Sequence, residues 1–78
     1  MTRPVDDDLY RRCIARLIEV RAEAGISQAG LATRLGRPQS FVSKYENGER
    51  RLDIAEFVAI LEQLDRNPVG ELRSLLAD

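Results

Sequence analysis

The chain has 78 residues, of which 44% are hydrophobic, 32% charged and 5% aromatic, and its formal net charge at pH 7 is -1. A domain of this size buries only about 60% of the surface of its unfolded chain, so we expect one small domain with a modest core. The single cysteine, Cys13, excludes a disulfide within the chain, and histidine is absent. Metal-ligand clusters of familiar spacing are therefore missing, which argues against an enzyme and predicts neither a metal nor a cofactor.

The sequence pattern predicts neither export nor a membrane span. The longest uninterrupted apolar run, Phe57 to Leu61, is far shorter than the ~20 residues that cross a bilayer. The acidic N-terminus lacks the apolar segment of a signal peptide. With only one cysteine, these features predict a cytoplasmic protein that does not bind membranes. We expect residues 1–5 to be a flexible tail and residues 1–78 to form a single domain, because no linker or repeat divides the chain.

Residues 6–24 have the pattern of a first helix. Acidic residues in its first turn complement the helix dipole, and Gly25 is a suitable end. The apolar stripe that begins at Tyr10 is interrupted by Arg21. A buried arginine needs an anionic partner. We therefore expect either an ion pair at Arg21 or, as the alternative, a solvated side chain.

The middle of the chain predicts two short helices joined by a tight turn, at residues 28–35 and 39–47. Ser27 is a good N-cap for the first helix, and Gly36 tolerates the positive φ expected just beyond its end. Ala32 allows two helix backbones to approach closely. Four apolar residues at helical intervals are suited to fixing the pair to the rest of the domain: Leu31, Leu35, Val42 and Tyr45.

The second of these short helices has a polar face. A merely solvated helix more often carries Glu/Lys pairs than the amide and hydroxyl cluster found here. The charge of the chain is also uneven, since residues 27–51 carry a net +3 and residues 52–78 a net -4. Such a basic window is the electrostatic footprint of a nucleic-acid binder, and chance clustering is the alternative. The residues of the polar face are Gln39, Ser40, Ser43 and Lys44.

Two further helices are predicted after residue 52. Asp53 and Glu56 have the spacing of a capping box, and Asn67 followed by Pro68 gives a second start signal. The first of these helices has a wide apolar face, made of Ile54, Phe57, Val58, Ile60, Leu61 and Leu64. The last helix, residues 68–76, is a candidate dimerisation helix; alternatively its apolar residues all belong to the core of one chain. These residues are Val69, Leu72, Leu75 and Leu76.

The middle segment resembles the Cro/phage-repressor type (XRE-like) family of helix-turn-helix domains, and the resemblance extends over about residues 9 to 76. It implies an all-α, compact five-helix, lambda-repressor-like DNA-binding domain whose second and third helices form the helix-turn-helix. The residues that carry the resemblance are Gln28, Ala32, Leu35, Gly36, Gln39, Ser40, Val42, Ser43, Lys44, Glu46, Asn47 and Gly48.

The polar face then becomes the DNA-reading surface, since recognition helices of this kind enter the major groove N-terminus first. We expect base contacts from the four polar-face residues named above. We expect phosphate contacts from Gln28, Arg37, Asn47, Gly48, Arg50 and Arg51. The resemblance also pairs Arg21 with Glu46 and lets Gln28 brace Gln39. Pro38, which we expect at the first position of the third helix, stands where relatives commonly have a capping Ser or Thr.

These features predict a sequence-specific regulator of transcription that binds double-stranded DNA as a homodimer on a pseudo-palindromic operator. Half-sites are expected about 10–10.5 bp apart, or a multiple of that spacing. The alternative is a protein-interaction module on the same fold, such as an antitoxin or a partner of another regulator. The acidic last third and the leucine-rich last helix favour that alternative.

Overall fold

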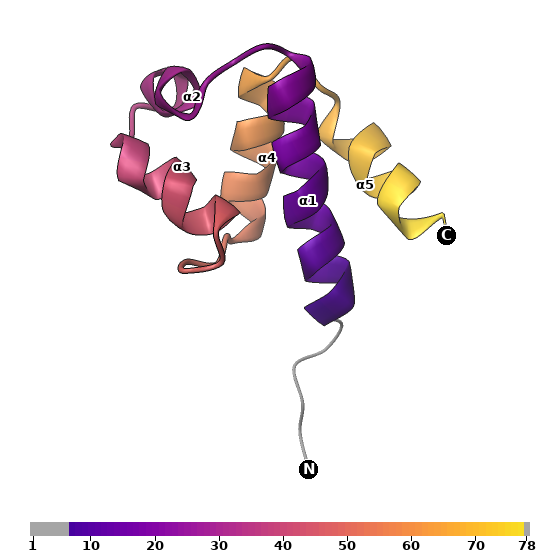
Figure 1. Ribbon diagram of the computed structural model, residues 1–78. Coiled ribbons are helices and arrows are strands. Elements are labelled where there is room, and N and C mark those ends of the chain that lie inside the picture. The colour runs from indigo at the N-terminus through magenta and orange to yellow at the C-terminus, as the bar shows by residue number, and fades with distance from the viewer. Residues whose placement is uncertain (1–6, 78) are drawn as a thin grey trace.

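The computed structural model describes residues 7–77, and within them the chain forms helices and no strand. The helices α1 and α4 lie at the centre, the pair α2–α3 lies on one side of them and α5 on the other (Figure 1). The predicted all-α class, with a helix-turn-helix in the second and third helices, is confirmed. The predicted tail at residues 1–5 lies outside the described residues. The helices are α1 (Asp7–Glu23), α2 (Gln28–Leu35), α3 (Gln39–Glu46), α4 (Ile54–Gln63) and α5 (Pro68–Leu76).

Short-range signals set the starts of three helices. The Ser27 hydroxyl accepts a hydrogen bond of 2.9 Å from the Gly30 amide at the start of α2. The capping box of α4 is complete, because Asp53 and Glu56 each accept from the other's backbone amide. The Asn67 side chain caps α5. These caps satisfy backbone N–H groups that a helix start otherwise leaves unpaired.

The third helix begins at Gln39, the first residue of its predicted range, and Pro38 lies just outside it. Pro38 is the N-cap, with φ -67° and ψ 154°, and makes no side-chain cap. The fixed φ of proline suits a cap as well as a first helical position, and here the extended ψ places it outside α3. At the other end Asn47 is the C-cap, and its amide donates to the Ser43 carbonyl at 3.0 Å. The helix therefore ends at Glu46, one residue before the end of the predicted range 39–47.

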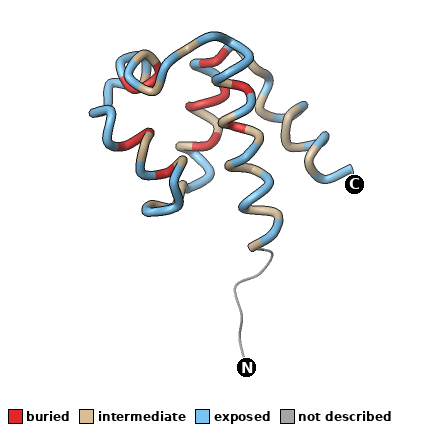
Figure 2. Tube along the Cα trace, viewed as in Figure 1, coloured by how far each residue is buried: buried red, intermediate tan, exposed pale blue. Residues whose placement is uncertain are grey.

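The buried residues belong mainly to α1, α2, α3 and α4 and lie on the stretches where these helices face one another (Figure 2). Ile54, expected on the apolar face of α4, is 69% exposed because it is the first residue of that helix and lies beyond the edge of the core. Phe41 is buried although the sequence had not marked it as core. The buried hydrophobic residues are Leu17, Val20, Leu31, Ala32, Phe41, Val42, Tyr45, Phe57, Ile60, Leu61 and Leu64.

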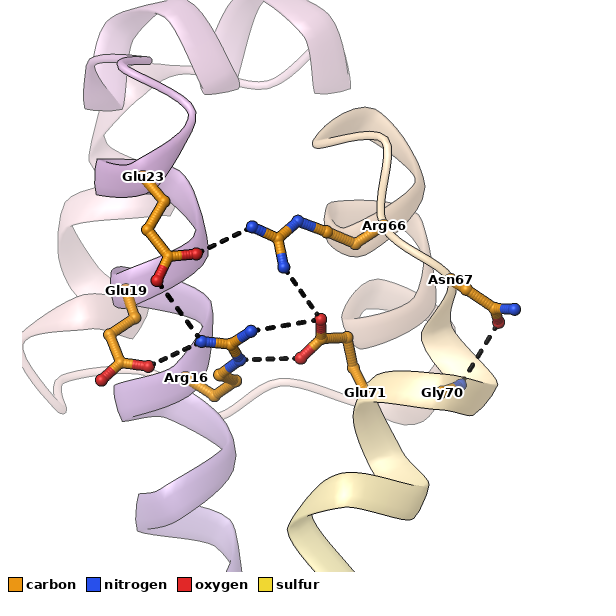
Figure 3. A network of polar contacts seen from close by, with 7 residues as sticks. All are labelled: Arg16, Glu19, Glu23, Arg66, Asn67, Gly70 and Glu71. Atoms are coloured by element: carbon orange, nitrogen blue, oxygen red, sulfur yellow. Dashed lines mark hydrogen bonds and ion pairs between the residues drawn. The ribbon is translucent and has the colours of Figure 1, made fainter.

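The last helix is attached differently, because α5 contains no buried residue. Arg16 of α1 donates to Glu71 through Nε at 2.7 Å and Nη2 at 3.3 Å. Arg66 donates to the same carboxylate at 3.2 Å and to Glu23 at 2.7 Å (Figure 3). Leu75 adds a partly buried apolar contact with the core. A network of charges, rather than a deep apolar contact, thus positions α5 against α1.

Tyr45 carries a buried hydroxyl that none of the described residues satisfies. Its side chain is fully buried, and the oxygen has no hydrogen-bond partner within residues 7–77. Burial raises the pKa of this hydroxyl, which therefore stays neutral. The other tyrosine is satisfied, since the Tyr10 hydroxyl accepts from the Leu52 amide at 3.0 Å.

Loss of the hydroxyl group should change the free energy of unfolding in opposite directions at the two tyrosines. Tyr45→Phe removes an unpaired buried polar group, so we expect the free energy of unfolding to rise by about 1 kcal/mol. Tyr10→Phe removes a hydrogen-bonded hydroxyl and should lower it by about 1 kcal/mol. Thermal unfolding of both variants measures the difference, with each kcal/mol worth roughly 4–8 °C in a domain of this size. A Tyr45→Phe variant that melts below the wild type would show that its hydroxyl is satisfied.

The α1–α5 network should make stability depend on acid pH. The hydrogen bond from Arg16 holds the pKa of Glu71 below its usual value of 4.5. Because the folded-state pKa is depressed, the contribution is complete above about 4.5 and is lost as the pH falls below it. We expect Glu71→Gln to lower the free energy of unfolding at pH 7 by about 1 kcal/mol and to lose less stability than the wild type between pH 7 and pH 3.

Urea unfolding at the two pH values measures this difference. Glu62→Gln is the control, since Glu62 lies exposed on α4 and is joined to no other described residue by an ion pair. Equal losses of stability in the wild type and in Glu71→Gln would mean that the network does not hold α5 in place.

Candidate nucleic-acid interface

The turn between α2 and α3 is built from a glycine and a small residue. Gly36 has φ 68°, in the left-handed region, and closes α2 as its C-cap. The Arg37 amide then donates to the Ala32 carbonyl at 2.9 Å. Ala32 is only 2% exposed, and its small side chain belongs to the buried core. This local geometry sets the direction in which α3 leaves the turn.

The inner face of α3 is buried and the outer face is free. Phe41, Val42 and Tyr45 are buried against the core. The polar residues expected to read bases lie on the other side, where three of them are exposed and Ser43 is half-buried. The Ser43 hydroxyl donates to the Ser40 carbonyl at 3.4 Å. The structure therefore brings Gln39, Ser40, Ser43 and Lys44 together on one face of α3.

An ion pair at the end of α3 fixes the helix in place. Arg21 donates to Glu46 through Nε at 2.7 Å and through Nη2 at 2.9 Å, and its Nη1 donates to the Ile26 carbonyl at 2.9 Å. The two side chains are 16% and 7% exposed. Hydrogen bonding to Glu46 raises the pKa of Arg21. Both charges are compensated, which a pair this far from water requires.

Gln28 belongs to this ion pair rather than to the polar face. Its Nε2 donates to Glu46 Oε1 at 2.9 Å. Among the hydrogen bonds of residues 7–77, none joins Gln28 to Gln39, so the expected brace between the two amides is absent from this structure. A nearly buried carboxylate is a stronger acceptor than an exposed amide, which explains the choice.

Arg37 and Arg50 converge on one carboxylate, that of Glu56. Arg50 makes a bidentate contact with it, from Nη1 to Oε1 and from Nη2 to Oε2, both at 2.9 Å. Arg37 Nη2 reaches Oε2 at 3.1 Å. Both guanidinium groups lie over the Phe41 ring, at 4.3 Å and 4.8 Å from its centroid. Two of the three expected phosphate-binding arginines are thus placed together, next to α3, and share an acidic residue.

The remaining expected phosphate contacts lie in the loop after α3. Asn47 is tied to Glu49, to which its side-chain amide donates at 2.7 Å. Gly48 has φ 88° and is exposed. Arg51 stacks over the Tyr10 ring at 4.0 Å and lies 3.4 Å from Asp7, yet its side chain remains 65% exposed.

Two residues of this site escaped the sequence analysis. Glu56 was recognised only as a capping residue, and Phe41 was not singled out at all. The Arg37-x3-Phe41 spacing gave no helical signal, because Arg37 precedes the N-cap Pro38 and lies outside α3. The partnership with Arg50 had no signal in the sequence, because it depends on how the loop after α3 returns toward α4.

The candidate dimer residues divide between the surface and the core. Val69 and Leu76 are 64% and 58% exposed, and Leu72 is half-buried beside them. Together with Arg73 they line an apolar hollow of about 290 Å³ on α5. Leu75 instead packs against the core of its own chain.

Neither a metal site nor a membrane span is found in the described part of the chain. Residues 7–77 contain no group of three or more His, Cys, Asp or Glu side chains placed to hold a metal ion. Within the same residues, no helix combines the length and the apolar character needed to cross a bilayer.

Comparison with known proteins identifies the family. A family model described as helix-turn-helix matches residues 17–70. Among solved structures, the chain is similar to an XRE-family like protein from Pseudomonas syringae pv. tomato str. DC3000, with 46% sequence identity and a TM-score of 0.90 over 94% of this chain and 89% of that one. No curated protein matches the chain. The family match covers more than half of the chain and includes both helices of the predicted motif, so this chain belongs to the XRE-type helix-turn-helix family of DNA-binding regulators.

Proposed function

We propose that the chain is a sequence-specific transcription regulator that inserts α3 into the major groove of double-stranded DNA. The observation that carries this proposal is the two-faced character of α3. Its inner face is fixed by buried aromatic and aliphatic side chains and by the Arg21–Glu46 pair, whereas its outer face presents four polar side chains, three of them exposed. Such a helix is rigid and offers hydrogen-bonding groups at one surface, as base reading requires.

The base contacts would come from the N-terminal half of that face. Gln39 is exposed in the first turn, and its amide suits the N6 and N7 atoms of adenine. Ser40 beside it accepts or donates according to the base. Lys44, one turn further on, is exposed and suits the O6 and N7 atoms of guanine. Ser43 lies between them and completes the reading surface.

The phosphate contacts would flank this face. In the loop after α3, Gly48 offers its backbone amide and Asn47 the side-chain N–H that Glu49 does not use, and Arg51 offers an exposed guanidinium. At the other edge, Gln28 lies at the start of α2, where backbone amides are available to an anion. Arg37 and Arg50 would contribute from beside Phe41. Such contacts set the register on DNA without reading its sequence.

A homodimer would double this surface on a pseudo-palindromic operator. The support is the apolar hollow on α5, where Val69 and Leu76 are largely exposed in a single chain. Exposed leucine and valine clusters on a small domain are typical of interaction sites. A second copy of the chain is the occupant we propose, with Leu72 at the centre and Leu75 contributing mainly to the core of its own chain.

The same surface supports one alternative function. Residues 52–78 carry a net charge of -4, and α5 presents its apolar side at this acidic end. A different protein with a basic, apolar groove would therefore also fit α5, as in an antitoxin or a module that binds another regulator. In that case DNA binding and occupation of α5 would be separable.

Selection of duplexes from a random library, followed by affinity measurements against salt, tests the main proposal. We expect a selected duplex to bind at least ~10³-fold more tightly than a scrambled one. With roughly six to eight phosphate contacts in a dimer, the log–log slope should be about -5 to -7. Gln39→Ala should cost about 1–3 kcal/mol on the selected duplex and little on the scrambled one.

Gln63→Ala is the matched control, because Gln63 is an exposed glutamine at the end of α4. It should bind both duplexes like the wild type. If no duplex is enriched, or if Gln39→Ala binds the selected duplex unchanged, α3 does not read DNA in the way proposed.

The dimer surface has its own test. Leu76→Glu places a charge in the hollow on α5, so sedimentation should show monomers at concentrations where the wild type is dimeric. DNA affinity should fall with it, by about tenfold or more, because two half-sites no longer act together. Ala22→Glu, at an exposed apolar residue of α1 that does not line that hollow, should leave the dimer intact. An unchanged sedimentation profile for Leu76→Glu would exclude α5 as the dimer interface.

A further inference from the structure

We propose that Glu56 limits the positive charge that the recognition helix's flanking arginines, Arg37 and Arg50, present to the DNA backbone. Glu56 would thereby set the non-specific affinity of the domain and the salt dependence of its binding. The inference rests on the proposed function, since it concerns how strongly the same surface holds phosphates.

The Glu56 carboxylate is fully used within the domain. Oε1 accepts from Arg50 Nη1 at 2.9 Å and from the Asp53 amide at 3.0 Å. Oε2 accepts from Arg50 Nη2 at 2.9 Å and from Arg37 Nη2 at 3.1 Å. The carboxylate belongs to a capping box at the start of α4 and is only 13% exposed. Its position is therefore fixed by its own helix, and it cannot follow either arginine outward.

The arginines it holds are still within reach of solvent. The side chains of Arg37 and Arg50 are 42% and 39% exposed. Both lie over the Phe41 ring, and Phe41 is part of α3. A phosphate approaching the edge of α3 would be attracted by the two guanidinium groups. It would also be repelled by the Glu56 carboxylate that lies against them.

The donors of the two arginines are used unequally. Arg50 commits Nη1 and Nη2 to Glu56, and Nη1 also donates to the Arg51 carbonyl at 2.8 Å. Arg37 commits only Nη2 among the hydrogen bonds of the described residues. Arg37 therefore has donors left for a phosphate while it remains paired, whereas Arg50 would have to leave Glu56. Together the three side chains offer a net single positive charge where the sequence alone counts two.

The negative charge of Glu56 persists throughout the pH range of DNA-binding measurements. Hydrogen bonds from Arg50 and from the Asp53 amide lower the pKa of Glu56 to about 2. A permanently ionised carboxylate so close to the edge of α3 weakens every phosphate contact nearby. A regulator gains specificity from this arrangement, since non-specific binding depends mainly on phosphate contacts.

Glu56→Gln removes this charge while keeping the fold. A glutamine at the third helical position can still accept the backbone hydrogen bond of the capping box. We expect it to bind an unrelated duplex about three- to tenfold more tightly at ~50 mM salt, with a log–log salt slope steeper by about 1, because one more cation is free to displace counterions. The selected duplex should gain less than the unrelated one, so the specificity ratio should fall.

Two variants control for charge and for shape. Glu62→Gln removes the same charge from the exposed far half of α4 and should keep the wild-type slope. Glu56→Asp keeps the negative charge on a shorter side chain, and it should also show the wild-type salt slope. Thermal unfolding of each variant checks the fold independently of DNA.

Three results would overturn the proposal. The first is that Glu56→Gln and Glu62→Gln show the same log–log dependence of DNA affinity on salt. The second is weaker DNA binding by folded Glu56→Gln, which would make the carboxylate a support for the arginines rather than a limit on them. The third is a Glu56→Asp variant that binds like Glu56→Gln. By contrast, a wild-type chain that shows no salt-dependent DNA binding would refute the proposed function itself.

Discussion

The arrangement of the first three helices depends on the compensation of one nearly buried carboxylate. Glu46 is the last residue of α3, and its two oxygens accept three hydrogen bonds, two from Arg21 of α1 and one from Gln28 of α2. Removing Arg21 would leave the carboxylate charge uncompensated in a site with little access to water, and removing the Gln28 amide would leave it one hydrogen bond short. The apolar core alone tolerates small rotations of α3, because it is non-directional, whereas this pair does not. The outward direction of the polar face of α3 therefore follows from an ion pair on its inner side.

Charge has a second structural use at the opposite end of the domain. No residue of α5 is buried, and Arg16 and Arg66 hold the helix through Glu71. A helix attached by ion pairs and half-buried leucines keeps one apolar side free, and that is the side on which a second chain is proposed to bind. The domain thus has a half around α3 that is fixed by burial, and a half whose attachment by ion pairs we expect to respond to salt and pH.

The sequence predicted what depends on neighbouring residues along the chain. Ser27, Gly36, Asp53 and Asn67 act through hydrogen bonds or φ angles within one turn, and each marks a helix boundary where it was expected. Predictions failed where the outcome depends on distant residues. Gln28 donates to Glu46, 18 residues away, rather than to Gln39. Ile54 has the right spacing for a core residue, but the core ends before it.

The distribution of charge along the sequence also misrepresents its distribution in space. By segment, Arg37 and Arg50 count toward a basic window and Glu56 toward an acidic one. In the fold these three side chains form one cluster beside Phe41. Conversely, Glu46 lowers the charge of the basic window, although Arg21 from outside it already compensates that carboxylate. The charge that DNA would meet is therefore set by which carboxylates are paired with which cations across helices. In a domain whose net charge is -1, this pairing would set how strongly the proposed reading face of α3 attracts a phosphate backbone.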